Sequence, residues 1–232
     1  WSAPSAGYYP QLYGVNYVLR VDPANALRVY GEANPAFTYT YYGLHTGDTS
    51  AILSGLSLST AATTTSNVGS YAITAGGSVI STAGQAYRLI QTPAALTVTQ
   101  RAITVTADAK SRAYGDANPA LTYQVGGSGL VNGDTLSGAL ATSATIASNI
   151  GVYGINQGTL AASGNYALNY ASADLTVTQR AITVTADAKS RAYGDTNPAL
   201  TYQVGGSGLA NGDTLSGALA TSATIASNVG VY

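Results

Sequence analysis

The side chains that could carry out catalysis are few in this sequence, and the histidine among them does not recur. Its one histidine, His45, stands where two later, similar segments have Val131 and Ala210. A Ser–His–Asp triad or a histidine metal cluster therefore cannot belong to the recurring design. The lack of Cys removes disulfides, thiolate metal ligands and cysteine nucleophiles. We predict that the chain is not an enzyme and has no catalytic residue.

Carboxylates do recur, at two turn positions in each of three similar segments. The aligned acids are Glu32, Asp116 and Asp195 in one set and Asp48, Asp134 and Asp213 in the other. Two carboxylates in each segment could form the pair that glycosidases use. Their places beside Gly and Asn favour a second interpretation, in which the acids cap turns and pair with aligned arginines. Those arginines are Arg28, Arg112 and Arg191.

A calcium ion is another ligand that such acids could bind. Calcium takes about six to eight oxygen ligands, usually from several carboxylates. The candidate ligands are Asp108, Asp116 and Asn118, together with backbone carbonyl groups. Because no dense acidic cluster surrounds them, we predict no metal site and no cofactor.

Tyrosine is the enriched aromatic residue, with 18 copies against one Trp and one Phe. Alternate tyrosines in strand-like segments, such as Tyr123, are expected to face a core. Tyr8, Tyr9, Tyr41 and Tyr42 could instead form an exposed contact surface for a glycan or another molecule, because an amphipathic ring suits an interface.

Charge and hydropathy argue against two classes of partner. Charged residues make up 8% of the chain, against roughly a quarter in an average soluble domain, and the net charge is -1. Nucleic-acid binding needs clustered Lys and Arg, which this sequence lacks. No run of about 18 apolar residues is present, so we predict no membrane insertion.

The chain consists of tandem repeats. Residues 101–153 return as residues 180–232 with three differences, which gives a period of 79 residues, and a divergent copy precedes them. We place the repeats at 17–100, 101–179 and 180–232, after a Tyr-, Gly- and Pro-rich lead at 1–16 that could end a preceding domain. An array of near-identical units multiplies length or valency, whereas a catalytic site needs one asymmetric set of residues.

The third copy contains no counterpart of residues 154–179. We expect either that the natural chain continues past Tyr232 or that a neighbouring molecule supplies the corresponding strands. The partners we predict are therefore neighbouring repeats of the same or a continuing chain. A homopolymer, or glycans on a host or biofilm surface, are the alternative partners.

A turn motif marks each repeat. It comprises Tyr30, Gly31 and Pro35 in the first copy, Tyr114, Gly115 and Pro119 in the second, and Tyr193, Gly194 and Pro198 in the third. The glycine permits a tight turn, and the proline keeps the residue before it extended. We interpret these residues, with the aligned arginines and acids, as structural residues that define the repeat.

Hydrophobic alternation predicts β-structure throughout. Ile103 and Val105 alternate with threonines, and Gly-, Asn- and Pro-rich turns separate such segments. We predict an all-β fold of tandem immunoglobulin-like β-sandwiches. Residues 175–184 leave almost no linker between two repeats, so we expect an extended rod. Residues 134–140 are ambiguous and could form one helical turn.

Together these features resemble the MBG repeat ("mostly beta, glycine-rich"), in the type with a Tyr-Gly-Asp signature. The resemblance rests on Arg-Ala-Ile-Thr-Val-Thr-Ala from Arg101 and Arg180, on Tyr-Gly-Asp from Tyr114 and Tyr193, and on Asn-Gly-Asp from Asn132 and Asn211. It covers nearly all of residues 17–232, although the first copy departs from the pattern with Glu32 for Asp and Thr46 for Asn.

The resemblance implies tandem immunoglobulin-like modules of very large secreted or surface-anchored bacterial proteins, including adhesins similar to filamentous haemagglutinin. It implies a stalk, spacer or adhesion role outside the cell, at the bacterial cell surface, and it supplies no catalytic residue. Two alternatives stay open: a glycan- or surface-binding module that uses exposed tyrosines, and a self-polymerising extracellular filament subunit completed by strand donation.

Overall fold

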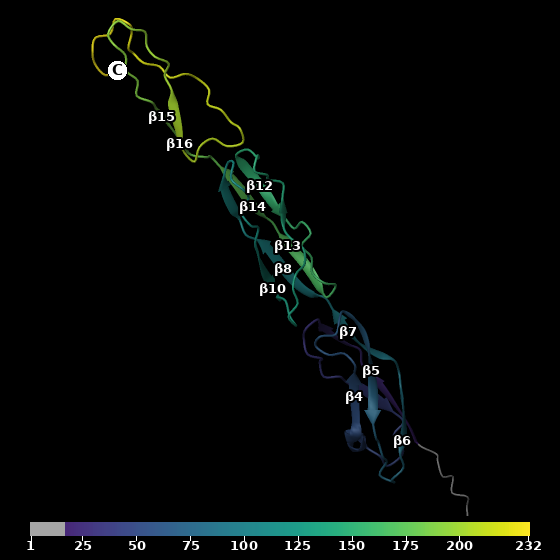
Figure 1. Ribbon diagram of the computed structural model, residues 1–232. Helices are drawn as coiled ribbons and strands as arrows, with labels where there is room; N and C mark the ends of the chain where they lie inside the picture. The colour runs from purple at the N-terminus through teal and green to yellow at the C-terminus, as the bar shows by residue number, and fades with distance from the viewer. Residues whose placement is uncertain (1–16) are drawn as a thin grey trace, which may run out of the picture. The chain divides into compact units, whose positions relative to one another are not determined.

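The computed structural model describes residues 17–232, coloured by residue number in Figure 1. The chain divides into two compact units. The first holds the residues up to Ile103 together with 127–136 and 162–169, and the second holds the remainder. Repeat 1 thus shares a unit with one end of repeat 2, and repeat 3 shares the other unit with the rest of repeat 2.

Strands account for nearly all the regular structure, as the alternation predicts. Repeat 1 contains β1 (Tyr17–Pro23), β2 (Ala26–Val29), β3 (Tyr39–Tyr42), β4 (Leu56–Thr60), β5 (Gly69–Gly77), β6 (Tyr87–Gln91) and β7 (Ala94–Thr99). Repeat 2 contains β8 (Arg101–Ala107), β9 (Lys110–Ala113), β10 (Tyr123–Gly127), β11 (Ala141–Thr142), β12 (Gly151–Asn156), β13 (Tyr166–Ala171) and β14 (Ala173–Thr178). Repeat 3 contains β15 (Ile182–Ala186) and β16 (Tyr202–Gly206).

Repeat 1 has two sheets, with the strand orders β3-β1-β6 and β2-β7-β5-β4. Two of the pairings are parallel, β1 with β6 and β2 with β7. β5 contacts β1 and β6 of the other sheet, so the sheets form two layers. Leu19, Val21, Ile73 and Leu96 face inward between them and are fully buried. This arrangement confirms the all-β tandem-repeat prediction, while its immunoglobulin-like detail stays a prediction.

The ambiguous segment after the second acid differs between the repeats. In repeat 1, residues Ser50–Gly55 form a short 3-10 helix, η1, whose Leu53 is buried. The matching part of repeat 2 has no helix, and there Ser137 forms an isolated antiparallel bridge with Ala161. The helical turn is therefore a feature of the divergent copy alone.

Repeat 2 repeats the two-sheet plan with the strand orders β10-β8-β13 and β11-β12-β14-β9. β14 is the central contributor to its core. It pairs antiparallel with β12 and parallel with β9, which places Leu175 opposite Lys110 and Val177 opposite Arg112. Leu175 and Val177 are buried because they alternate with threonines that face outward.

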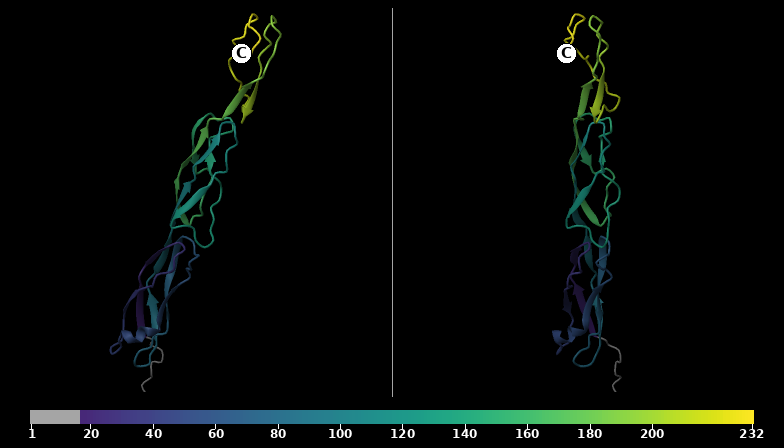
Figure 2. Two further views of the ribbon diagram at one scale, coloured as in Figure 1. Left: turned by 90° about the vertical axis from the view of Figure 1, so that its left-hand side faces the viewer. Right: turned by 60° about the vertical axis from the view of Figure 1, so that its left-hand side comes forward.

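Repeat 3 contains two strands among its described residues. β15 and β16 form a two-stranded antiparallel sheet, and both views in Figure 2 show them side by side. No other strand occurs among residues 187–232 of repeat 3. In particular, Lys189–Ala192, the counterpart of β9, pairs with no strand in the described part of the chain.

Candidate functional site: the junctions between repeats

The residues that define the repeat meet where repeat 1 joins repeat 2, inside the first compact unit. The hydroxyl of Tyr30, from repeat 1, donates a hydrogen bond to Asp134 Oδ2 at 3.0 Å. Tyr166, from repeat 2, donates to the same oxygen at 2.7 Å. The two rings lie edge to face with their centroids 5.5 Å apart. One carboxylate thus holds a tyrosine from each of two consecutive repeats.

The turn after β2 directs Tyr30 to this position. The Tyr30 amide donates to the Thr99 carbonyl at 2.9 Å, at the end of β7. Gly31 has φ +83°, a left-handed conformation that glycine adopts without a steric cost. A Cβ on Gly31 would also meet Val131 Cγ2 at 2.4 Å. Both the turn and the close approach of repeat 2 therefore require glycine in the Tyr-Gly motif.

An apolar cluster surrounds the two tyrosines. Tyr30, Val98, Ile103 and Tyr166 are all buried and in contact. Burial raises the pKa of Tyr166 above its usual value, and the hydrogen bond to Asp134 adds to this rise. Tyr166 is therefore a neutral hydrogen-bond donor at ordinary pH, and it carries no perturbation that would suit it for acid–base catalysis near neutrality.

Arg101 ties the same junction through backbone groups. Its Nε donates to the carbonyls of Ser128 and Gly129 at 3.1 and 3.0 Å, and its Nη2 donates to Ser128 at 2.5 Å. Its Nη1 donates to the Tyr30 carbonyl at 3.4 Å. The planar guanidinium therefore joins a loop of repeat 2 to the Tyr-Gly turn of repeat 1.

Two amide side chains extend this network. Asn165 Oδ1 accepts from the Val68 amide at 2.9 Å, and Asn165 Nδ2 donates to Asn67 Oδ1 at 2.9 Å. Gln100 Nε2 donates to the carbonyls of Gly164 and Tyr166 at 3.1 and 3.3 Å. The short segment from Gly164 to Tyr166 is thus bound to repeat 1 at several points.

The second junction, inside the second compact unit, repeats the arginine contacts 79 residues later. Arg180 Nε donates to Ser207 and Gly208 carbonyls at 3.1 and 2.9 Å, and Nη1 donates to the Tyr114 carbonyl at 3.2 Å. Nη1 also forms an ion pair with Asp116 Oδ1 at 2.6 Å. In repeat 1 the corresponding acid is Glu32, which accepts from the Val29 amide instead.

Sequence reasoning identified only part of this site. It singled out Tyr30, Gly31 and Asp134 as repeat-defining residues and Arg101 as the start of the family motif, but it assigned no contact to Arg101, Asn165 or Tyr166. The available signal was the arginine that opens both later repeats at the same period. A signal for Tyr166 was also present, because Tyr87 stands 79 positions earlier in repeat 1.

The aligned arginines are not paired with the acids, and that interpretation was wrong. Arg28 donates to Asn34 Oδ1 at 2.8 Å and to the carbonyls of Val29 and Thr63. Arg112 and Arg191 make the same three kinds of contact within their own repeats. In each repeat the side-chain oxygen of the Asn-Pro asparagine accepts a hydrogen bond from the arginine Nε, so the asparagine takes the place that an acid was expected to fill.

The calcium candidates have other hydrogen-bond partners. Asp108 accepts from the Thr122 hydroxyl, Asp116 pairs with Arg180, and Asn118 Oδ1 accepts from Arg112 at 2.7 Å. Among residues 17–232, no group of three His, Asp or Glu side chains is placed to share a metal ion. Asp195 and Asp213 lie in two separate turns. The Asp195 amide donates to the Ala192 carbonyl, and the Asp213 amide donates to the Ala210 carbonyl.

The four tyrosines considered for surface contact do not form one surface in the described structure. Tyr8 and Tyr9 lie outside the described residues. Tyr41 is half-buried against the core of repeat 1 that contains Leu19 and Val21. Tyr42, the next residue of β3, is 59% exposed. Because successive side chains of a strand point to opposite faces, only Tyr42 presents its ring to solvent here.

The N-terminal end of repeat 1 shows a variation of the junction. Asp48 accepts from the Tyr87 hydroxyl at 2.7 Å, as Asp134 does from Tyr166. The Tyr17 ring stacks on His45 at 4.2 Å and lies 5.4 Å from Tyr87. His45 is therefore an aromatic packing partner. Hydrogen bonds from Thr82 and Tyr87 lower the pKa of Asp48 below its usual value, which keeps that carboxylate ionised.

These features define the chain as an all-β protein of tandem repeats whose candidate functional sites are the junctions between repeats. Within residues 17–232, no helix has the length and apolar character needed to cross a membrane. A family model described as "MBG domain (YGX type)" matches residues 19–97, 103–176 and 182–232. The chain therefore belongs to the MBG domain family, as its motifs predict. No curated protein matches it.

Proposed function

We propose that this chain is a stalk or filament segment of a large secreted or surface-anchored bacterial adhesin, and that it gives reach and surface attachment outside the cell. The observation that carries the proposal is the recurrence of one joining device. Arg101 and Arg180 bind equivalent carbonyl groups in the repeat they open and in the repeat before it. A contact that fixes one repeat against the next is what a spacer needs.

The chemistry of the junctions supports a mechanical role. The guanidinium and phenol groups that join repeats are bound to backbone carbonyls and to the carboxylates of Asp134 and Asp116. Apolar burial of Tyr30 and Ile103 adds adhesion between the repeats. Membership of the MBG family supports the interpretation as a repeat module of surface proteins.

The spacer role is tested by measuring how firmly the junction holds. The chain has no Cys, so spin labels can be placed on cysteines introduced at Leu27 in repeat 1 and Ala167 in repeat 2, two exposed positions of the first compact unit. Double electron–electron resonance should give one narrow distance distribution, which Arg101→Ala should broaden. Arg20→Ala, which removes an exposed arginine bound to Asp22, is the matched control and should leave it narrow. A broad distribution in the unchanged chain contradicts the spacer role.

The location is tested separately with antibodies raised against the chain. Staining of intact, unpermeabilised cells of the source bacterium, or recovery of the protein from its medium, is the expected result. Staining that requires permeabilisation contradicts an extracellular stalk. Glycan binding has less support, because Tyr42 is the one candidate tyrosine of residues 17–232 with a mainly exposed ring.

A further inference from the structure

In repeat 1 the strands that open the repeat lie beside the strands that end it, and they run in the same direction. β1 pairs in parallel with β6 over five residue pairs, and β2 pairs in parallel with β7 over four. Repeat 2 shows the same pairing between β9 and β14, again over four residue pairs. Both repeats thus place an entry strand against an exit strand, and this arrangement determines how they respond to tension along the chain.

Tension along the chain enters repeat 1 through β1 and leaves it through β7. It passes into repeat 2 directly, because β7 ends at Thr99 and β8 begins at Arg101. The pull draws β1 and β2 toward their own first residues, and it draws β6 and β7 toward their own last residues. Because the paired strands are parallel, the two pulls are opposite along one axis and load all the hydrogen bonds of a pairing together. Peeling the strands apart would instead break these bonds one after another.

A threonine fastens the exit strand to the entry strand. The Thr99 hydroxyl donates a hydrogen bond to the Arg28 carbonyl at 3.2 Å, and the Thr99 carbonyl accepts one from the Tyr30 amide at 2.9 Å. In repeat 2, Thr178 makes the same two contacts at the same distances. The last residue of the exit strand is therefore bound through its side chain and its backbone, at the point where tension leaves the repeat.

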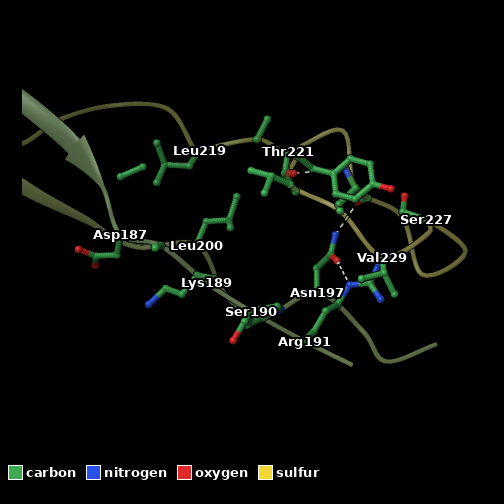
Figure 3. Close-up of a pocket in the computed structure, with 18 of the residues that line it drawn as sticks. Asp187, Lys189, Ser190, Arg191, Asn197, Leu200, Leu219, Thr221, Ser227 and Val229 are labelled. Carbon is green, nitrogen blue, oxygen red and sulfur yellow. Dashed lines mark hydrogen bonds between the residues drawn. The ribbon is translucent and has the colours of Figure 1, made fainter. Parts of the chain in front are cut away.

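The entry strand is anchored to the rest of the repeat by its arginine. Arg28 of β2 is 4% exposed, and its guanidinium donates to Asn34 Oδ1 at 2.8 Å and to the Thr63 carbonyl. β9 carries an arginine with the equivalent contacts. Figure 3 shows the same arginine–asparagine contact in repeat 3, between Arg191 and Asn197. Because this guanidinium binds groups outside its own strand, a pull on the entry strand is passed on to the rest of the repeat.

We propose that the parallel entry and exit strands of repeats 1 and 2 form a mechanical clamp, which keeps each repeat folded while the chain is under tension. Thr99 and Thr178 are the residues that hold the two strands against sliding. The inference deepens the proposed stalk role and rests on it, since a stalk that attaches a cell to a surface is stretched when the cell is pulled away. Resistance to pulling depends on the unfolding barrier and on the direction of the force, so it is a property distinct from equilibrium stability.

The clamp is tested by pulling repeat 1 in two directions with optical tweezers, through handles on cysteines introduced into the 232-residue chain, which has none. In the sliding geometry the handles are at Val18 and Gln100, beside the start of β1 and the end of β7. In the peeling geometry they are at Leu27 and Thr97, which lie opposite each other across β2 and β7. All four positions are exposed. The unfolding force should be at least about two-fold higher in the sliding geometry, because only sliding loads the bonds of the parallel pairings together.

A substitution at Thr99 tests which contact holds the strands. Thr99→Val removes the hydroxyl that binds the Arg28 carbonyl, so it should lower the unfolding force in the sliding geometry and leave the force in the peeling geometry unchanged. Thr74→Val is the matched control. It makes the same change in the antiparallel pair of β4 and β5, where the Thr74 hydroxyl lies 3.3 Å from that of Ser59, and it should alter neither force.

Two results would overturn the clamp. One is an equal unfolding force in the two geometries. The other is an equal fall in both geometries for Thr99→Val, which would mark a general loss of stability. Either result would leave a narrow spin-label distance distribution between repeats 1 and 2 intact, so failure of the clamp is distinguishable from failure of the stalk role.

Discussion

Repeats 2 and 3 have almost the same sequence, but they bury it differently. Ile103 and Val105 of β8 are 1% and 0% exposed, whereas their counterparts in β15, Ile182 and Val184, are 37% and 45% exposed. The inward-facing alternation is the same in both strands. The difference arises because β8 lies between β10 and β13 in the sheet of repeat 2, whereas β15 pairs with β16 alone among the described strands. Apolar patterning therefore specifies a face, and distant strands determine whether that face is buried.

The polar contacts of the aligned arginines, in contrast to the buried apolar faces, are alike in repeats 2 and 3. Arg112 donates to Asn118 at 2.7 Å and to the Ala113 carbonyl at 3.1 Å. Arg191 in repeat 3 makes the equivalent bonds at 2.7 and 3.2 Å. These bonds join groups close in sequence. The local turn network is therefore the same in repeats 2 and 3.

The largest expected effect comes from shortening the matched isoleucines. Ile103→Ala should lower the free energy of unfolding of the surrounding structure by about 2–5 kcal/mol, because it leaves a cavity among buried side chains. Ile182→Ala should cost less than about 1 kcal/mol, since the Ile182 side chain is already 37% exposed to solvent. Hydrogen exchange with peptide-level resolution separates the two repeats. Equal losses at the two positions would contradict the difference in burial.

The next largest effect concerns Arg112 and Arg191, the arginines bound to the asparagine of the Asn-Pro motif. Arg112→Ala should destabilise repeat 2 by about 3 kcal/mol, because it removes several charge-assisted hydrogen bonds and leaves buried carbonyls unpaired. Arg191→Ala should cost about half as much, since water can reach the groups it leaves. Denaturant unfolding monitored by exchange at each repeat measures both. A larger loss in repeat 3 would contradict the expectation that exposed hydrogen bonds contribute less to stability than buried ones.

A smaller loss of stability is expected from changing Tyr166, the tyrosine of repeat 2 at the first junction. Tyr166→Phe should cost about 1–2 kcal/mol, because Asp134 loses one donor and the Val131 amide loses its acceptor. Tyr153→Phe is the matched control, since that hydroxyl binds the exposed Asn149 carbonyl and should contribute little.

Tyr166→Phe should also change how the stability of the chain depends on pH in the alkaline range. The pKa of Tyr166 is raised in the folded chain, chiefly by burial, so the unfolded chain loses that proton first as pH rises past about 10. Stability contributed by the neutral phenol is complete below that pH and is lost as pH rises through the folded pKa. Thermal unfolding between pH 9 and about 11 should therefore show a steeper decline in the unchanged chain than in Tyr166→Phe.

The sequence predicted the fold class, the repeat and the family, because each depends on patterns that recur along the chain. It also identified Tyr30, Gly31 and Asp134 as defining residues, although it did not bring them together. The arginine pairing failed for a physical reason: Arg28 lies nearer to Asn34 and to backbone carbonyls than to Glu32, and spacing alone does not rank such acceptors. The junction arginines needed the structure, because their partners are backbone groups that any sequence provides.

The smallest expected effect concerns a local contact of repeat 3, the hydrogen bond between Thr201 and Asp187. The hydrogen bond from the Thr201 hydroxyl is the main reason that the pKa of Asp187 lies below its usual 3.8. A lowered pKa contributes stability that is present above 3.8 and is lost as pH falls through the folded value. NMR titration of the Asp187 carboxyl group should therefore give a midpoint below 3.8, and Thr201→Val should move it back toward 3.8. A midpoint at the usual value, unchanged by Thr201→Val, would mean that the contact between Thr201 and Asp187 does not form in solution.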